Sequence, residues 1–341
     1  MASRITIDGS FGEGGGQVLR SSLALSLITG KPFEIHHIRS KRKKPGLMAQ
    51  HLTSVNAAVE IGCAKVSGNI IGSTTVIFDP TCINAGNYHF NIGTAGSCTL
   101  VLQTILLPLM ISDKPSSICI EGGTHNPFAP PYDFLKKAFL PLIQQMGPEV
   151  SIQLITHGFY PKGGGKIEVN ISPSKELKHF TLCDRGQLIT INAIAKVAQL
   201  PESIAQRELK TIAKKMNITD NNLHLETINN SNGPGNVVSV EIQSEHCTEV
   251  FTEFGKIGVS AEKVASKVAR SASQYLLEPV AVGKYLADQL LMPMAMTGKG
   301  KFTTLAPSQH TLTNIEIIKK FLDVEFRINH LSEQCVEIEI V

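Results

Sequence analysis

The chain has 341 residues, of which 42% are apolar. That exceeds what one core of ordinary domain size needs, so at least two cooperating units are expected. Its net charge of +3 is too small to identify a nucleic-acid-binding protein by overall charge, so any contact with nucleic acid must be local. Seven scattered cysteines without a C-x-x-C pair indicate reduced thiols in a cytoplasmic protein. The longest apolar run, residues 100–110, is too short to span a membrane.

A strand and a glycine-rich turn open the chain. Residues 1–8 contain no basic region followed by an apolar stretch, which predicts no secretory signal. The strand 5–8 leads into a turn over residues 12–17, Gly-Glu-Gly-Gly-Gly-Gln, whose free backbone N–H groups are suited to an anion. The turn fits neither the Walker A pattern nor G-x-G-x-x-G, so a tight connection from strand to helix is the alternative interpretation. Glu13 would repel an anion unless a divalent cation lay between them, and we therefore predict that Glu13 is a metal ligand.

A first helix over residues 16–30 is predicted next, followed by a strand over 33–38 and a basic loop that ends at Pro45. Arg39 and Arg42 in this loop are predicted to bind phosphate groups of the substrate. A solvated loop or a localisation signal would have the same composition. A second helix is predicted over residues 48–61.

This order of elements recurs twice. Helices over 96–113 and 283–298 open with a glycine, strands over 117–121 and 301–305 follow, and second helices are predicted over 132–145 and 312–321. When the first helices are aligned at their C-terminal ends, Arg20, Gln103 and Asp288 share one position, each as the single polar residue of an apolar run. Three such residues favour one shared cleft over three separate hydrogen-bonded groups in the core.

Residues 184–278 interrupt the third unit and are predicted to form a small inserted α/β domain, with strands over 188–195 and 237–243 and helices over 203–216 and 261–276. The strand 165–171 is predicted to open the third unit. The large repeat domain would then comprise residues 1–183, with the first two repeats and the start of the third, and residues 279–341, which complete it.

His310 lies after the strand 301–305, in a loop at the start of an apolar helix. Aligning the second helices at their ends places Gln50 and His51 opposite Gln309 and His310. A histidine in such a position is more often a capping or packing residue than a nucleophile. The chain contains no zinc-binding motif of histidine and cysteine, so a structural zinc site is not expected.

Taken together, the motifs resemble those of the RNA 3′-terminal phosphate cyclases. They cover nearly the whole chain in order, at residues 13–20, 44–47, 50–52, 93–97, 122–124, 126–127, 129–131, 157–161, 233–236, 283–289 and 309–310. The resemblance implies an α/β (α+β) fold of three tandem repeats, each with a four-stranded sheet and two helices, plus the smaller inserted domain. This sequence has His125 where the family often has an acid, and a more basic stretch at 40–43.

The resemblance also implies a reaction in which ATP converts an RNA 3′-phosphate to a 2′,3′-cyclic phosphodiester, with release of AMP and pyrophosphate. His310 matches the histidine that carries AMP in this family, with Glu13 and Arg20 as further catalytic residues. A divalent cation, Mg²⁺ or Mn²⁺, would bind at Glu13. Arg39 and Arg42 would contact ribose or RNA phosphate.

The same resemblance implies that Tyr285, Pro130 and Phe134 enclose the adenine, although Tyr285 and Phe134 are equally typical of a core. The remaining ATP-binding residues are expected to be Gln50, Gln103, Leu286, Ala287, Asp288, Gln289 and Arg39. The expected partners are ATP and RNA 3′-phosphate ends, with no membrane, and the chain is expected to be a cytoplasmic monomer or dimer.

Two alternatives compete with this enzyme. Cyclase-like factors of ribosome assembly share the architecture and act as binding proteins, but retention of His310, Glu13 and Arg20 argues against that role. Enolpyruvyl transferases also use repeated units of sheet and helix. Their phosphate-sugar signature is not found in this sequence, although repeat architecture alone does not exclude them.

Overall fold

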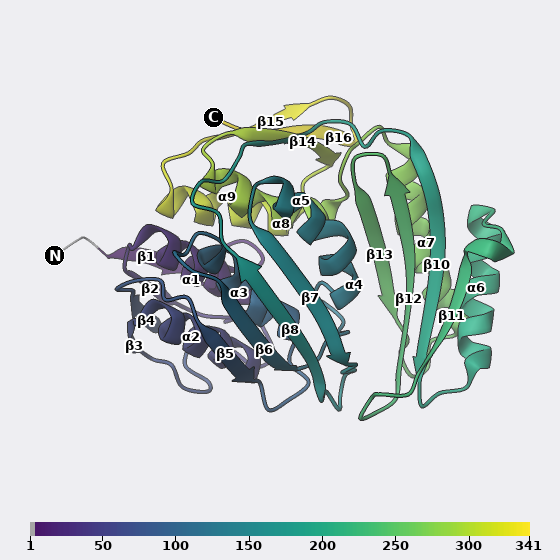
Figure 1. Cartoon of the computed structure of the whole chain (residues 1–341), viewed down its shortest axis with the longest axis horizontal. Coiled ribbons are helices and arrows are strands. Elements are labelled where there is room, and N and C mark those ends of the chain that lie inside the picture. The colour runs from purple at the N-terminus through teal and green to yellow at the C-terminus, as the bar shows by residue number, and fades with distance from the viewer. Residues whose placement is uncertain (1–3) are drawn as a thin grey trace.

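A βαβαββ unit recurs three times in the computed structural model, which describes residues 4–341 (Figure 1). The first unit consists of β1 (Ile5–Asp8), α1 (Gly16–Thr29), β2 (Phe33–His36), α2 (Ala49–Gly62), β3 (Lys65–Ser67) and β4 (Val76–Asp79). Its strands form one sheet in the order β1-β2-β4-β3. The pair β1 and β2 is parallel, as their connection through α1 requires, and the other pairs are antiparallel.

The second unit has the same strand order, β5-β6-β8-β7. It consists of β5 (Asn87–Asn91), α3 (Cys98–Met110), β6 (Ser116–Gly122), α4 (Tyr132–Phe134), the π-helical turn η1 (Leu135–Phe139), α5 (Leu140–Gln145), β7 (Glu149–Thr156) and β8 (Gly165–Ser172). The predicted helix over 132–145 is therefore continuous but contains a π turn.

The strand predicted to open the third unit was assigned wrongly. Residues 165–171 form β8, which pairs antiparallel with β6 and β7 and completes the second sheet. The third unit opens instead with β9 (Phe180–Leu182), which pairs parallel with β14. A strand of three residues is too short to show the alternation by which strands are recognised in a sequence.

The third unit continues with α8 (Lys284–Met296), β14 (Gly300–Leu305), α9 (Gln309–Phe321), β15 (Phe326–His330) and β16 (Cys335–Ile340). Its sheet has the order β9-β14-β16-β15, which is the order of the first two units. Figure 1 shows β14, β15 and β16 along the top of the molecule, with α8 and α9 beneath them. The predicted fold class of three repeated units is confirmed.

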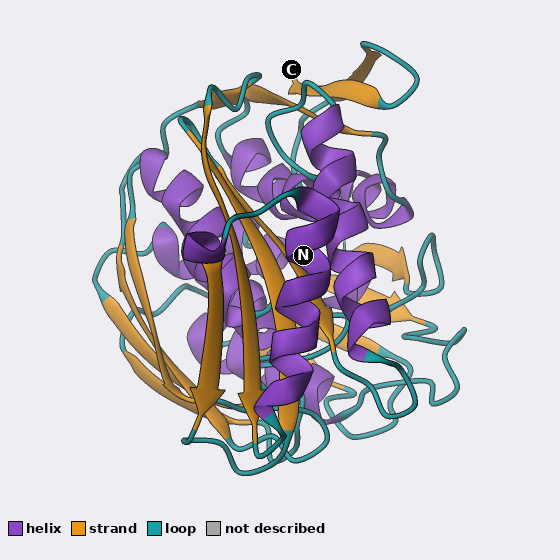
Figure 2. Ribbon diagram, turned by 90° about the vertical axis from the view of Figure 1, so that its right-hand side faces the viewer, coloured by secondary structure: helices purple, strands orange, loops and turns teal. Residues whose placement is uncertain are grey.

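A fourth sheet is inserted between β9 and α8. It contains β10 (Leu188–Ala198), α6 (Glu202–Met216), the short η2 (Asp220–Asn222), β11 (Leu223–Ile228), β12 (Gly235–Ser244), β13 (Thr248–Phe254) and α7 (Ala261–Leu277), in the strand order β11-β10-β12-β13. The helices α6 and α7 pack against each other and against one face of this sheet, and Figure 2 views the molecule from their side. The predicted domain boundaries, 183/184 and 278/279, stay a prediction.

Two large hydrophobic cores and one small cluster around Phe159 stabilise these layers. The larger core runs continuously through the three units, and the second fills the space between the inserted sheet, α6 and α7. Helices α1 and α3 are buried on nearly all sides, and α1 contacts α2, α3 and α9. A helix that is largely apolar on all sides belongs inside a core. Within residues 4–341, none of the helices combines the length and the apolar character needed to cross a membrane.

Candidate active site

His310 is the second residue of α9. The hydroxyl group of the N-cap residue, Ser308, accepts a hydrogen bond from the backbone N–H of Thr311 at 3.1 Å, and this fixes the start of the helix. The side chain of His310 is 49% exposed. In α2, Gln50 is likewise the second residue after the N-cap, Met48, so His310 corresponds to Gln50, one residue from the predicted pairing with His51.

A chain of hydrogen bonds connects His310 to Asp288 through Gln17. The Nδ1 atom of His310 lies 2.9 Å from the side-chain oxygen of Gln17, and the side-chain nitrogen of Gln17 lies 2.9 Å from each carboxylate oxygen of Asp288. Because a carboxylate accepts hydrogen bonds, the amide nitrogen of Gln17 faces Asp288 and its oxygen faces the imidazole. Nδ1 of His310 therefore carries the proton, and Nε2 has the free lone pair.

Arg20 and Asp288, from equivalent helix positions in two units, lie near each other. Burial lowers the pKa of Arg20 to about 10, an effect that the charge of Asp288 opposes. Burial also raises the pKa of Asp288, against the charges of His310 and Arg20 and hydrogen bonds from Gln17 and Asn314. Arg20 is thus a cation at neutral pH in a partly enclosed position. Such a group binds an anionic ligand more strongly than an exposed one does.

Gln103 is the third residue of this predicted position. Its side-chain nitrogen donates a hydrogen bond to the side-chain oxygen of Gln289, which follows Asp288 on α8. The structure therefore brings all three predicted positions to one region of the helical core. Arg20 and Asp288 interact electrostatically, and Gln103 is connected to them through the neighbour of Asp288.

His51, which lies beside Arg20, is a residue to which sequence analysis assigned no role. Burial and the charges of Arg20 and Arg39 lower its pKa to about 3, so it is neutral at physiological pH. A Cβ atom on Gly16 would lie 2.4 Å from Nε2 of His51 and 2.8 Å from a guanidinium nitrogen of Arg20. The absence of a side chain at Gly16 thus lets these groups approach the start of α1.

The glycine-rich turn lies beside His310. A carboxylate oxygen of Glu13 is 3.9 Å from Nε2 of His310, the nitrogen with the free lone pair. Gly12 and Gly14 have φ values of 57° and 62°, a region that glycine adopts without strain. Among the described residues, no side chain caps α1 at Gly15. The N–H groups of its first turn are therefore available to an anion, beside Arg20.

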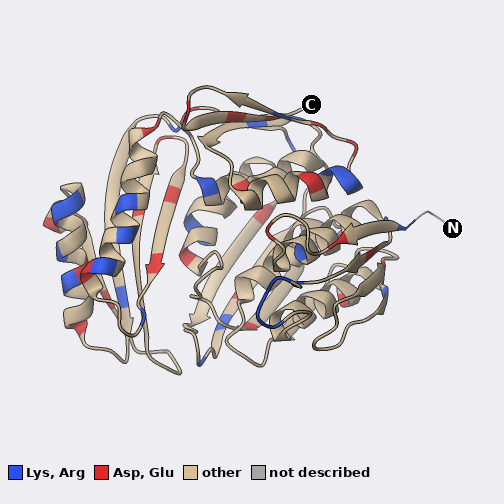
Figure 3. Ribbon diagram, turned by 180° about the vertical axis from the view of Figure 1, so that it is seen from behind, with Lys and Arg blue, Asp and Glu red and all other residues tan. Residues whose placement is uncertain are grey.

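Arg42 extends from the basic loop to the glycine turn, where its guanidinium group pairs with the carboxylate of Glu13. Arg39 is held within its own loop, because it donates to the carbonyl oxygens of Lys44 at 2.8 Å and Gly46 at 2.7 Å. Figure 3 shows the loop as a nearly continuous run of basic residues. Its position gives the protein a local positive surface beside His310.

The residues predicted to enclose adenine differ in exposure. Tyr285, the second residue of α8, is 61% exposed, and Pro130 is partly exposed. Phe134 is 3% exposed and belongs to the large core, as do Leu286 and Ala287. Tyr285 and Pro130 therefore present apolar surface to a ligand in this structure, whereas the other three side chains pack inside the protein.

Gln50 connects two units. Its side-chain oxygen accepts a hydrogen bond from the backbone N–H of Ser97, the N-cap residue of α3, at 2.8 Å. Gln50 precedes His51 on α2, so this bond also fixes the helix that positions His51. In the structure Gln50 therefore holds the start of α3 against α2.

Glu13 fits one type of divalent-cation site. It supplies a single carboxylate, and Mg²⁺ characteristically binds one or two protein carboxylates and takes other ligands from substrate phosphates and water. A group of three metal-ligand side chains within residues 4–341, His89, Cys119 and Glu121, lies on β5 and β6 and does not include Glu13. Glu13 thus suits a cation that arrives with a phosphate ligand.

Gln17 and Asn314 were not predicted as site residues. Gln17 precedes Arg20 by three residues, a spacing that places both on one side of α1. That spacing could have identified Gln17. Asn314 donates to Asp288 at 3.3 Å and accepts from Ser21 at 2.8 Å, contacts between distant segments that no local pattern indicates.

Comparison with known proteins places this chain beside one family and a similar relative. A family model described as RNA 3′-terminal phosphate cyclase matches residues 11–328. A relative from Koribacter versatilis (strain Ellin345), named RNA 3′-terminal phosphate cyclase, is 49% identical over 336 residues, which cover 98% of this chain and 94% of the relative. The matched regions include the glycine turn, the basic loop, α8 and the start of α9.

Proposed function

The chain belongs to the RNA 3′-terminal phosphate cyclase family, and from this membership we propose that it converts RNA 3′-phosphate ends to 2′,3′-cyclic phosphodiesters with ATP, through a covalent AMP on His310. The observation that carries this proposal is the hydrogen-bonded chain from Asp288 through Gln17 to Nδ1 of His310. It leaves Nε2 unprotonated, as a nucleophile requires.

In the first step, the Nε2 lone pair of His310 attacks the α-phosphorus of ATP. A bond from nitrogen to phosphorus forms, the bond from the α-phosphorus to the oxygen bridging to the β-phosphate breaks, and pyrophosphate leaves. The imidazole becomes positively charged as it reacts. Asp288 stabilises that charge through Gln17, while Arg20 and the N–H groups at the start of α1 stabilise negative charge on phosphate.

In the second step, an oxygen of the RNA 3′-phosphate attacks the same phosphorus, and His310 leaves as neutral imidazole. The RNA end then carries AMP through a new phosphoanhydride bond. In the third step, the adjacent 2′-hydroxyl attacks the RNA phosphorus, loses its proton and expels AMP. This last step is intramolecular, so proximity alone accelerates it.

A divalent cation, Mg²⁺ or Mn²⁺, would be held by Glu13 and would neutralise phosphate charge near His310. Glu13 already pairs with Arg42, which would shift toward the RNA phosphate as the cation binds. Arg39 would contact ribose or RNA phosphate from the same loop.

The adenine would lie between Tyr285 and Pro130, which offer exposed apolar surface. Gln103 and Gln289 would contact the nucleotide from the helical core, and Gln50 from the start of α2. Phe134, Leu286 and Ala287 would support this pocket from within the core.

Neither of the two alternative functions gives His310 a covalent role. A cyclase-like binding factor has no use for a histidine with a free Nε2 beside a carboxylate, near a half-buried arginine. An enolpyruvyl transferase is disfavoured by the family match along residues 11–328. A cytoplasmic location and a monomeric or dimeric state stay predictions; the seven cysteines are free thiols in the structure.

Incubation with ATP labelled at the α-phosphate, with Mg²⁺ or Mn²⁺, tests the proposal. We expect labelled protein whose bond is labile in acid and stable in alkali, as a histidine phosphoramidate is. His310→Ala should lose the label, while His330→Ala, which changes an exposed histidine on β15, should keep it. Folded wild-type protein that takes up no label would refute the covalent mechanism.

A further inference from the structure

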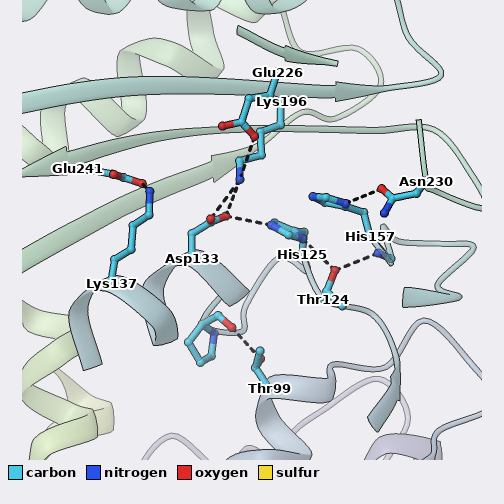
Figure 4. Close-up of polar contacts among 12 residues, drawn as sticks. Thr99, Thr124, His125, Asp133, Lys137, His157, Lys196, Glu226, Asn230 and Glu241 are labelled. Carbon is cyan, nitrogen blue, oxygen red and sulfur yellow. Dashed lines mark hydrogen bonds and ion pairs between the residues drawn. The ribbon is translucent and has the colours of Figure 1, made fainter. Parts of the chain in front are cut away.

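The inserted sheet contacts the elements that carry the proposed adenine-binding residues. One face of the sheet is covered by α6 and α7, and strand β13 contacts α4 and η1 of the second unit. Figure 4 shows the polar side chains that join these two parts of the molecule. Pro130 lies two residues before α4, next to its N-cap residue Pro131, so the position of α4 determines where this wall of the proposed pocket lies.

Three polar contacts, here called joints, connect the inserted sheet to the repeated units. The first joint is an ion pair between Lys196 and Asp133. Lys196, on β10, is 8% exposed, and its Nζ atom lies 3.1 Å from each carboxylate oxygen of Asp133 on α4. Glu226 on β11 contacts the same lysine at 3.3 Å. Removing one partner of a buried ion pair leaves the other charge uncompensated, which makes this contact sensitive to substitution.

Asp133 receives another hydrogen bond from within its own unit. The Nε2 atom of His125, whose side chain is fully buried, lies 3.1 Å from the carboxylate, and Nδ1 lies 2.9 Å from the hydroxyl group of Thr124. Burial alone would raise the pKa of Asp133, but the hydrogen bond from His125 and the charge of Lys196 outweigh burial and hold that pKa well below its usual range. Asp133 is therefore an ionised carboxylate between the two parts.

A second joint lies one helical turn further on. Lys137, on η1, pairs with Glu241 on β12, which is 8% exposed. Asp133 and Lys137 are four residues apart, so both project from the side of the helix that faces the inserted sheet. On another side, the carbonyl oxygen of Pro130 accepts a hydrogen bond from Thr99 of α3 at 2.7 Å. The wall is thus held between α3 and the inserted sheet.

A third joint connects the inserted sheet to α8. The buried carboxyl group of Glu249, on β13, accepts a hydrogen bond from the backbone N–H of Gly283, the N-cap residue of α8. A Cβ atom on Gly283 would lie 3.2 Å from this carboxyl oxygen, so the glycine permits the close approach. Tyr285 lies two residues further along, and Asp288 follows on the same helix.

We propose that the inserted sheet is a clamp for the nucleotide pocket, in which Lys196 and Glu241 position the Pro130 wall and Glu249 positions the start of α8 with Tyr285. This inference rests on the proposed function, because it takes Pro130 and Tyr285 as the walls around adenine. Lys196, Glu241 and Glu249 are positioning residues, since they act through α4, η1 and α8.

The clamp makes ATP affinity depend on residues of the inserted sheet that do not touch ATP. We expect Lys196→Met to raise the ATP concentration for half-maximal labelling of His310 by about tenfold, with less than about a twofold change in the rate at saturating ATP. Lys196→Arg, which keeps the charge, should return the value to within about threefold of wild type. Loss of folded protein would instead lower the final amount of label at an unchanged ATP dependence.

Two substitutions of Glu249 form a matched pair that tests the third joint. Glu249→Ala removes the acceptor for the Gly283 N–H group and should weaken ATP binding in the same way. Glu249→Gln keeps a carbonyl oxygen at that position and should behave as wild type. Arg207→Ala is the control, because Arg207 forms an exposed ion pair with Glu262 between α6 and α7, away from all three joints.

Hydrogen–deuterium exchange without ATP tests the clamp independently of catalysis. Lys196→Met should increase amide exchange over residues 131–139, and Glu249→Ala over residues 283–288, relative to Arg207→Ala. An unchanged ATP dependence and unchanged exchange in both variants would overturn the clamp. If wild-type protein took up no label, the proposed function would fail, and the exchange measurement would still decide whether the inserted sheet holds these elements.

Discussion

The orientation of Gln17 determines which ring nitrogen of His310 carries the proton. A glutamine can present either end of its amide group, but Asp288 accepts from the nitrogen and leaves the oxygen for the imidazole. The positively charged guanidinium group of Arg20 interacts electrostatically with the same carboxylate. In the proposed mechanism, Gln17 and Asp288 therefore control the reactivity of His310 without contacting the phosphorus themselves.

Gln17→Leu removes the hydrogen bonds to Asp288 and His310 with little change in side-chain volume. We expect the rate of His310 labelling at saturating ATP to fall by about 10- to 100-fold, because the imidazole loses both its fixed tautomer and the stabilisation of its positive charge by Asp288. Nitrogen-15 NMR of the His310 ring measures this directly. Wild type should show a protonated Nδ1, and the variant a mixture of tautomers. Gln145→Leu, at an exposed position on α5, is the control, and a wild-type spectrum in Gln17→Leu would contradict the role of Gln17.

At the scale of elements, the start of α1 shows how closely the site is packed. Gly16 leaves room for His51 and Arg20 where a Cβ atom would collide with both. The turn before it bends through Gly12 and Gly14, so the first N–H groups of α1 and the carboxylate of Glu13 lie beside His310.

Gly16→Ala should displace His51 and Arg20 and lower the rate of labelling by about tenfold or more, since misplaced catalytic groups lose positioning. Gly30→Ala is the matched control at the other end of α1. A Cβ atom there meets no atom within 4 Å, but the φ value of 67° should cost about 1 kcal/mol of stability without affecting labelling. Equal labelling by both variants would show that the space beside Gly16 has no catalytic importance.

The contact of β13 with α8 should make stability depend on pH. Burial raises the pKa of Glu249 to about 8, above its ordinary value of 4.5, despite hydrogen bonds from Gly283 and Val250. Its contribution is therefore fully present below about pH 4.5 and is lost as the pH rises toward 8, where the folded protein must hold a buried charge.

Glu249→Gln should remove this dependence, because glutamine stays neutral. Relative to wild type, we expect the variant to gain roughly 1–3 kcal/mol in the free energy of unfolding between pH 5 and pH 8, measured by urea denaturation. Glu208, whose pKa burial raises to about 7, produces a similar slope, so Glu208→Gln serves for comparison. A parallel pH profile for wild type and Glu249→Gln would contradict an ionising carboxyl group at this joint.

At the scale of the whole molecule, a net charge of +3 conceals a concentrated basic surface. The loop from Arg39 to Lys44 lies beside the glycine turn, and Arg42 reaches Glu13. Lys43 and Lys44 are exposed. Their position suits an RNA backbone that leads its 3′ end toward His310.

Replacing Lys43 and Lys44 together by glutamine should weaken binding of RNA that ends in a 3′-phosphate. The slope of log affinity against log salt should decrease by about 1.4, the value for two phosphate contacts with a single strand. Labelling of His310 by ATP alone should be unchanged. An unaltered salt dependence would mean that the RNA follows another surface.

Much of the architecture was predictable because it repeats along the chain. Three helices of similar composition, each before a strand, indicated the three units, and the inserted residues stood out by breaking that order. The assignment of residues 165–171 was wrong because β8 alternates like any other strand, and pairing with β6, not its own pattern, places it in the second sheet.

The sequence by itself determined the repeated units, the glycine turn with Glu13, the basic loop and the position of His310 at the start of a helix, since these depend on spacing between neighbouring residues. Tertiary structure alone decided that Gln17 lies between Asp288 and His310, which are 271 and 293 positions away from it. It also decided that Lys196 and Glu249 hold α4 and α8. Such contacts arise where buried helices and sheets of different units pack together, and local residue patterns carry no information about which distant side chain will be the partner.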